Sequence, residues 1–298
     1  MEERMLKGIW APLTTPFNDQ DEIDFDALVH NILRYEKSRL EGYLLLGSNG
    51  EPRSMLESER RKLLEFYASQ PIEKNVMVGI SVESMKQAKY AIHQVTDLGF
   101  NTCLVSPPSY FSKMADGEVI VDFYLQLAAS SSIKIILYNC PGFLNNVAIS
   151  PKLLHRFFGN PNIIGIKDSG SSGPFAFLSR ANLDNPDFSI LSGTANFLYP
   201  ALHCGATGGV VSLANAIPDT CVELYDLFLK EEYSQARELH NRLQRINQEV
   251  SGIYGVAGVK AAMDICGYNG LNPRSPYRKL DENQRAKIRQ ILEKERMI

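Results

Sequence analysis

The chain has little cysteine and no histidine pair spaced for metal binding. Its five cysteines are odd in number and widely spaced, and none forms a CxxC pair: Cys103, Cys140, Cys204, Cys221 and Cys266. We therefore expect neither a disulfide framework nor a thiolate zinc site, and interpret the cysteines as reduced and mostly packed. The five histidines form no HxxxH or HExxH pair, so no metal is expected.

Clustered basic charge and long apolar runs are also absent. The formal net charge is -3 and the pI is about 6.0, which argues against nucleic acid or an anionic membrane as a partner and favours a small molecule. The start "MEERMLKGIW" lacks the apolar stretch of a signal peptide, and no later run approaches the roughly 20 residues that span a bilayer. We expect a cytoplasmic protein.

What the sequence does contain is a repeated pattern of short apolar runs that end in small or polar residues. Runs of this kind suit strands that are covered on both faces, as in a parallel sheet. There are eight: "GIWAPLTTP", "GYLLLGSNGE", "VMVGIS", "NTCLVSPPSY", "IKIILYNCPG", "IIGIKDSG", "FSILSGTA" and "TGGVVSLAN".

Segments with helical periodicity separate the runs. In the first, Phe25, Leu28, Val29, Ile32 and Leu33 share one predicted face. Glycines at positions 99 and 205 stand where a helix needs a left-handed cap. The alternation predicts a (β/α)8 barrel, a size that 298 residues allow in one domain, although an open doubly wound sheet fits the alternation alone.

The pattern changes after Pro218, where only helical segments follow, at 219–250, 256–267 and 281–298. We expect a barrel over residues 1–230 and a C-terminal helical layer over residues 231–298. That layer either braces the barrel or forms an oligomer contact.

In such a barrel the active site lies at the carboxyl ends of the strands, so the residues that close each run are candidates. They are Thr14, Thr15, Ser48, Asn49, Tyr110, Tyr138, Lys167, Gly193 and Val211. Among the lysines, Lys167 alone closes a run, whereas Lys134 begins one. A desolvated strand-end lysine has a lowered pKa and can form a Schiff base with a carbonyl substrate. The alternative is a solvated cation paired with Asp168.

Each of the two tyrosines among the candidates can be interpreted either as a structural residue or as a catalytic one. Tyr138 is either a packed aromatic or an acid/base group beside the imine, and Tyr110 is a loop aromatic or part of the same site. The turn "GSNGE" allows the amides of Ser48 and Asn49 to face an anion. A carboxylate suits this turn better than a phosphate, because it has no lysine and no Walker or GxGxxG spacing.

Taken together, "GSNGE", "PPSY", "LYNCPG", "IIGIKDSG", "SGTANF" and "GGVVSLAN" resemble, in order and spacing, the dihydrodipicolinate synthase / N-acetylneuraminate lyase family over nearly the whole chain. The resemblance implies a homotetrameric barrel that forms a lysine imine with pyruvate or another 2-oxo acid and uses no metal or organic cofactor. It implies Lys167 as the imine lysine, Tyr138 as the acid/base, and Ser48 and Tyr110 in a proton relay. Tyr110 inserted from a neighbouring subunit is one arrangement that it allows.

The resemblance also bears on substrate binding. It implies that Ser48 and Asn49 hold the 2-oxo acid carboxylate, and that Gly193 and Val211 line the pocket. Synthase members of the family have two threonines in place of Ser48 and Asn49, and an arginine in place of Phe143 that clamps aspartate semialdehyde. Because Phe143 cannot clamp a carboxylate, lysine biosynthesis is not favoured.

The motif wording is most similar to 4-hydroxy-2-oxoglutarate aldolase and 2-keto-3-deoxy sugar acid aldolase members, so we expect a pyruvate-forming class I aldolase. The same imine also supports a dehydratase or a synthase, including N-acetylneuraminate lyase and dihydrodipicolinate synthase activities. Two other classes stay open: a non-catalytic barrel that binds a 2-oxo acid, and a structural oligomer with a vestigial pocket.

Overall fold

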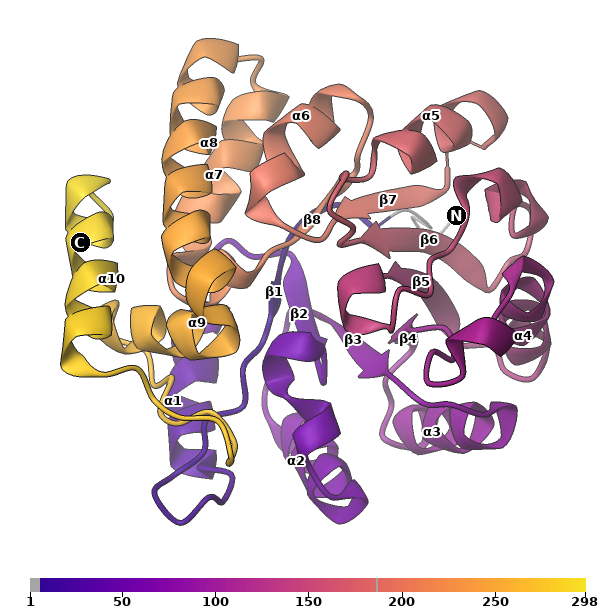
Figure 1. Ribbon diagram of the computed structural model, residues 1–298, viewed down its shortest axis with the longest axis horizontal. Coiled ribbons are helices and arrows are strands. Elements are labelled where there is room, and N and C mark those ends of the chain that lie inside the picture. The colour runs from indigo at the N-terminus through magenta and orange to yellow at the C-terminus, as the bar shows by residue number, and fades with distance from the viewer. Residues whose placement is uncertain (1–5, 186) are drawn as a thin grey trace. The chain divides into compact units, whose positions relative to one another are not determined.

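The computed structural model describes residues 6–185 and 187–298. Residues 1–5 of the start "MEERMLKGIW", where we expect no signal peptide, lie outside the described residues. Eight parallel strands form a closed barrel in chain order (Figure 1). They are β1 (Gly8–Pro12), β2 (Gly42–Leu45), β3 (Asn75–Ile80), β4 (Thr102–Val105), β5 (Lys134–Asn139), β6 (Ile163–Asp168), β7 (Ser189–Ser192) and β8 (Gly208–Val210). Each falls within or overlaps one of the eight apolar runs. The closure of the sheet confirms the predicted barrel and rejects the open sheet.

The α-helices connect these strands or follow them. They are α1 (Phe25–Glu36), α2 (Glu57–Ser69), α3 (Met85–Asp97), α4 (Gly117–Ala129), α5 (Phe175–Asp184), α6 (Leu198–His203), α7 (Pro218–Leu229), α8 (Tyr233–Asn247), α9 (Ile253–Ile265) and α10 (Glu282–Lys294). The crossover from β5 to β6 contains only short 3-10 helices. Two of them, at Pro141–Phe143 and Pro151–Arg156, begin with proline, which the first turn of a helix tolerates because its N–H would have no partner there.

The predicted buried face of α1 is correct at Leu28 and Ile32 but wrong at Leu33, which is 56% exposed. The buried stripe instead continues through Tyr35, three residues after Ile32. Leu33 follows Ile32 directly and therefore lies about 100° around the helix from it.

By its internal contacts the chain divides into two compact units. The first unit comprises the N-terminal segment that ends at Gly8 together with Val76–Val210. In it, α3, α4 and α5 lie on the outer side of β4 to β7 (Figure 1). Gly99 and Gly205 have φ angles of 86° and 98°, which confirms the predicted left-handed positions after α3 and α6.

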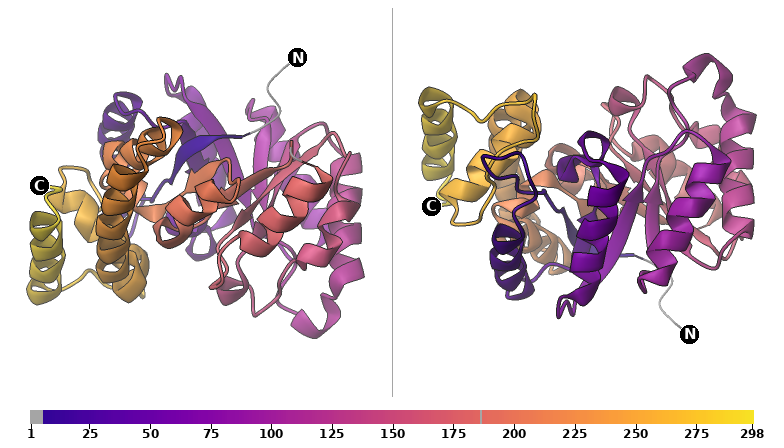
Figure 2. Two further views of the ribbon diagram at one scale, coloured as in Figure 1. Left: turned by 90° about the horizontal axis from the view of Figure 1, so that it is seen from above. Right: turned by 90° about the horizontal axis from the view of Figure 1, so that it is seen from below.

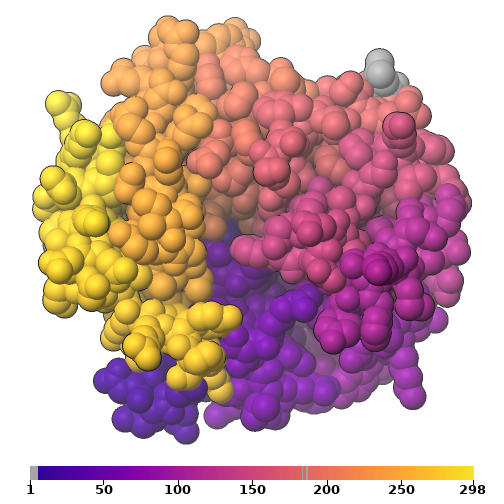
Figure 3. Space-filling model, in the orientation of Figure 1, coloured from indigo at the N-terminus to yellow at the C-terminus, as the bar shows by residue number. Residues whose placement is uncertain are grey.

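The second unit comprises Ile9–Asn75 and Val211–Ile298. Its C-terminal segments are helical as predicted, except that 219–250 does not form one helix: a turn separates α7 from α8, with Glu231 at a φ of 60°. Helix α10 packs against α8 and α9, and Figures 2 and 3 show this layer in orange and yellow. The expected division at 230/231 falls in the α7–α8 turn and stays a prediction.

Among the residues that the structure describes, no helix is both long enough and apolar enough to cross a membrane.

Candidate active site

Lys167 and Tyr138 lie opposite each other on neighbouring strands of the first unit. They form a register pair of the parallel β5–β6 ladder, one residue before each strand ends. The side chains are buried, at 5% and 8% exposed, and Nζ of Lys167 lies 4.8 Å from the centre of the Tyr138 ring. Both residues therefore sit at the carboxyl ends of their strands, where barrel enzymes carry their chemistry.

The surroundings of Lys167 favour its neutral amine. Burial lowers the pKa of Lys167 from its usual value of 10.5 to about 8, and the nearby Cys140 thiol opposes this shift. The alternative of a solvated Lys167 paired with Asp168 is wrong, because Lys167 is buried and the Asp168 carboxylate bonds elsewhere. Lys134 lies at the opposite end of β5, as expected, and donates from Nζ to Pro161 O at 3.0 Å.

A buried polar pair follows directly after these two residues. Nδ2 of Asn139 donates to Oδ1 of Asp168 at 2.6 Å, and Oδ1 of Asn139 accepts from the amide of Ile149 at 2.9 Å. Burial raises the pKa of Asp168 above its usual value. This pair ties together the ends of β5 and β6, and our sequence interpretation missed it. The sequence indicates the pair only in that a polar residue comes directly after Tyr138 and another directly after Lys167.

Gly193 extends the same arrangement to β7. Its amide donates to Asp168 O at 2.7 Å. A Cβ at this position would collide with the hydroxyl of Ser169. Glycine is therefore required where the chain leaves β7 beside the end of β6.

The predicted residues Tyr110 and Phe143 lie on loops, with side chains 72% and 69% exposed. The backbone around Tyr110 is nevertheless fixed. Its amide donates to Oε2 of Glu83 at 2.9 Å, and its carbonyl accepts from Nδ2 of Asn145 at 3.2 Å. Its ring packs edge-on against Phe111, with 4.9 Å between the centres. The structure thus holds Tyr110 in place but leaves its side chain exposed on the single chain.

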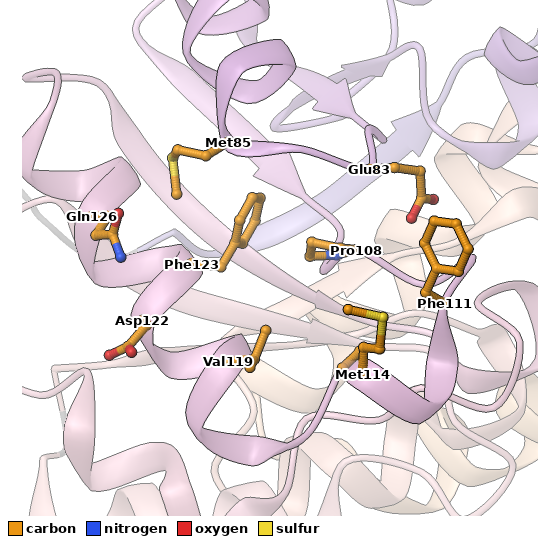
Figure 4. Close-up of a pocket in the computed structure, with 10 residues that line it drawn as sticks. Glu83, Met85, Pro108, Phe111, Met114, Val119, Asp122, Phe123 and Gln126 are labelled. Carbon is orange, nitrogen blue, oxygen red and sulfur yellow. The ribbon is translucent and has the colours of Figure 1, made fainter.

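A pocket of about 410 Å³ lies beside this loop, and neither Lys167 nor Tyr138 lines it. Figure 4 shows the Phe123 ring lying between Met85 and Pro108 in its wall. Glu83 lines it too, but its carboxylate already accepts the amides of Ser109 and Tyr110. The pocket is a separate feature of the first unit.

In the second unit, Ser48 and Asn49 belong to a tight turn after β2, which includes the 3-10 helix η1 (Ser48–Gly50). Gly47 is required before it, because a Cβ there would lie 2.7 Å from the Leu44 side chain. Nδ2 of Asn49 is buried and has no hydrogen-bond acceptor among the described residues. The turn therefore holds an amide donor that a bound acceptor would satisfy.

The remaining candidates of the second unit are buried. Val211 is fully buried and its amide donates to Trp10 O at 3.2 Å. Thr14 and Thr15 are also buried, and Oγ1 of Thr15 donates to Gly50 O at 2.9 Å, which supports the turn.

The sequence interpretation overlooked a second buried lysine. Lys260 of α9 is 1% exposed and forms an ion pair with Glu51. Burial lowers its pKa to about 8, and Glu51 opposes the shift. Its signal was a cation within the apolar stretch "VAGVKAAM", since a buried lysine usually has a partner.

The closed parallel barrel, with a buried lysine at the end of β6, places this protein in the (β/α)8 class. The chain belongs to the dihydrodipicolinate synthetase family, whose sequence pattern matches residues 5–295. This confirms the predicted family.

Relatives with different names match almost the whole chain. A putative mitochondrial 4-hydroxy-2-oxoglutarate aldolase of Coccidioides immitis is 28% identical, with 96% of this chain and 94% of the relative covered. A 4-hydroxy-tetrahydrodipicolinate synthase of Caldicellulosiruptor saccharolyticus is 27% identical, with 97% and 96% covered. Identity therefore does not separate aldolase from synthase.

Solved structures agree on the fold. The 4-hydroxy-tetrahydrodipicolinate synthase of Methylacidiphilum fumariolicum SolV has a TM-score of 0.89 at 26% identity, with 98% of this chain and 96% of that chain covered. YagE, a prophage protein of E. coli K12 that was solved with pyruvate, has a TM-score of 0.90 at 22% identity, with 98% and 99% covered.

Proposed function

We propose that this protein is a pyruvate-forming class I aldolase that cleaves a 4-hydroxy-2-oxo acid or a 2-keto-3-deoxy sugar acid through a Schiff base on Lys167. The observation that carries the proposal is the burial of Lys167, which lowers its pKa to about 8 beside the Tyr138 ring. A buried amine with a lowered pKa has a sizeable neutral fraction near neutral pH, and the neutral amine is the nucleophile.

The first half of the reaction forms the imine. The neutral amine of Lys167 attacks C2 of the 2-oxo acid, and the carbonyl oxygen leaves as water after it is protonated. The product is a protonated imine that draws electrons from the adjacent carbon atoms. Tyr138 is the proposed proton carrier for the departing oxygen, since it lies directly beside Lys167.

The second half breaks the carbon–carbon bond. Tyr138 takes the proton of the 4-hydroxyl, the C3–C4 bond breaks, and its electrons move into the iminium to give an enamine. An aldehyde leaves. The enamine is then protonated at C3, and water hydrolyses the resulting iminium to pyruvate and the free lysine, so each catalytic group returns to its starting state.

Substrate binding is assigned by the family resemblance. We propose that Ser48 and Asn49 hold the substrate carboxylate, and the unsatisfied Nδ2 of Asn49 supports this. By the same resemblance, we propose that Ser48 and Tyr110 complete the proton relay. Gly193 and Val211 are the proposed lining of the substrate pocket.

Phe143 favours an aldolase over the synthase alternative. An aromatic ring has no guanidinium to form a bidentate contact with a second carboxylate. Its side chain is 69% exposed, so it can contact the aldehyde half of a substrate without being part of the core.

The test is release of pyruvate from 4-hydroxy-2-oxoglutarate and from 2-keto-3-deoxy sugar acids, followed with a coupled pyruvate assay and product identification. An aldolase yields pyruvate and an aldehyde, whereas a dehydratase yields a 2-oxo product with an intact carbon chain. Lys167→Arg should be inactive, and full pyruvate release by this variant would refute the proposal. A non-catalytic barrel would bind the acids without turnover.

We also propose that the protein is a homotetramer in which Tyr110 enters the site of a neighbouring subunit. Tyr110, Phe111 and Met114 support this, because they form an exposed apolar group at 72%, 66% and 71% exposure. The cytoplasmic location likewise stays a prediction.

A further inference from the structure

A buried ion pair lies directly behind the turn that contains Ser48 and Asn49. We propose that Lys260 and Glu51 are positioning residues that hold this turn in the geometry required to bind the substrate carboxylate. The inference rests on the proposed function, because it assigns a task to the carboxylate-binding turn.

Lys260 uses its whole ammonium group to join three segments of the second unit. Nζ donates to Thr15 O and to Asn272 O, each at 2.6 Å, and lies 2.6 Å from Oε1 of Glu51. The contact with the Glu51 carboxylate is an ion pair. Nζ also lies 4.7 Å from the centre of the Phe17 ring. An ammonium has three protons, and three oxygen atoms surround this one. Lys260 is therefore a structural cation and not a second nucleophile.

Glu51 transmits this attachment to the turn. Its other carboxylate oxygen accepts from the amide of Arg274 at 2.9 Å. Its backbone is left-handed, with φ 56° and ψ 38°, and its amide donates to Ser48 O at 3.2 Å. A residue with a Cβ is uncommon in this conformation, which persists where the surroundings enforce it. The Glu51 side chain supplies that constraint on the residue that ends the turn.

The turn is held from a second side by Thr15. Its hydroxyl donates to Gly50 O at 2.9 Å, while its own carbonyl accepts from Lys260. Lys260 thus fixes the turn twice, through Glu51 and through Thr15. A displacement of the turn's backbone would move the amides of Ser48 and Asn49 together.

Stability alone does not account for a charged pair at this position. Buried ion pairs often contribute no more stability than well-packed apolar residues of similar volume. A group that binds a ligand, in contrast, must be held close to its productive geometry by its supporting contacts. The Lys260–Glu51 pair meets that second requirement.

The experiment measures pyruvate binding in the full chain by trapping the Lys167 imine with borohydride over a series of pyruvate concentrations, with intact mass as the readout. The variants are Glu51→Gln, which keeps the shape of the side chain, and the double variant Lys260→Met with Glu51→Gln. Glu59→Gln is the matched control, because it breaks the ion pair of Arg274 with Glu59, at 2.7 Å in the same unit, without touching the turn.

Both test variants should need about tenfold more pyruvate for half-maximal trapping, a loss of about 1.4 kcal/mol in binding. Their maximal trapped fraction should be unchanged, and the control should match the natural protein in both respects. Folded test variants with unchanged half-maximal concentrations would overturn the positioning role while leaving the aldolase proposal intact. A natural protein that traps no pyruvate would overturn the proposed function itself and this inference with it.

Discussion

Nζ of Lys167 lies 4.8 Å from the centre of the Tyr138 ring, and the two residues are register partners on adjacent parallel strands. The β5–β6 ladder fixes their backbones, and the Asn139–Asp168 hydrogen bond at 2.6 Å fixes the strand ends just beyond them. The sheet itself thus places the Lys167 amine beside the Tyr138 ring, and a sheet is more rigid than a loop.

Imine formation should depend on pH through the amine of Lys167. With a pKa of about 8, the neutral fraction is roughly one tenth at pH 7 and becomes dominant above pH 8. The rate of imine formation should therefore rise about tenfold per pH unit up to about pH 8 and then level off. Rapid mixing with pyruvate, a borohydride quench and intact mass measure this rate. A rise that continues to pH 10 would show an ordinary, solvated lysine.

Lys167→Met should stabilise the protein near neutral pH while abolishing trapping. The pKa of Lys167 is lower in the folded protein than the usual 10.5, so between about pH 8 and 10.5 the unfolded chain binds more protons. The free energy of unfolding therefore rises with pH across this window. Below about pH 8 Lys167 is mainly charged in the folded protein, and there the burial of the cation lowers the stability most. Methionine removes that cost, and we expect a gain of about 1–2 kcal/mol at pH 7. Urea unfolding at pH 7 and pH 10 should show the gain shrinking at the higher pH.

Tyr138→Phe should slow both imine formation and cleavage, because both steps lose their proposed proton carrier. The ring beside Lys167 is retained, so pyruvate is still trapped after long incubation, but trapping should be slower and pyruvate release should fall by about 10²–10⁴-fold. Tyr124→Phe is the matched control: it removes another buried hydroxyl of the same unit, which donates to Val105 O at 2.8 Å. Equal losses in both variants would assign the effect to packing.

Two inactive variants should restore activity when they are mixed. If Tyr110 enters the neighbouring site, a Lys167→Ala chain can supply Tyr110 to a Tyr110→Phe chain that still has Lys167. Unfolding and refolding an equal mixture should recover up to about a quarter of the natural activity in a paired arrangement. Recovery that never exceeds the separate variants would place Tyr110 in the site of its own chain.

The barrel could be predicted because its signals are local. Each strand is a short apolar run, and Gly99 and Gly205 mark left-handed positions that glycine adopts readily. Leu33 was misassigned because a helix has several apolar residues near the edge of its buried face, and packing decides which of them is covered.

The supporting contacts of the site could not be predicted in the same way. Asn139 and Asp168 are 29 residues apart in sequence, and Lys260 reaches Thr15 across 245 residues. Partners at such separations depend on the folded barrel, so the sequence shows a polar residue in an apolar setting but not what it contacts. The strand-end position of Lys167, in contrast, was visible from the run that precedes it.

The measurement that tests the central claim most directly is the intact mass of the protein after incubation with pyruvate and sodium borohydride, with Lys167→Ala and Lys260→Met in parallel. The natural protein should gain the mass of one pyruvic acid less one oxygen atom. Lys260→Met should gain the same mass but need a higher pyruvate concentration, and Lys167→Ala should gain nothing. An adduct that survives in Lys167→Ala, or no adduct in any of the three, would contradict the assignment of Lys167 as the Schiff-base lysine.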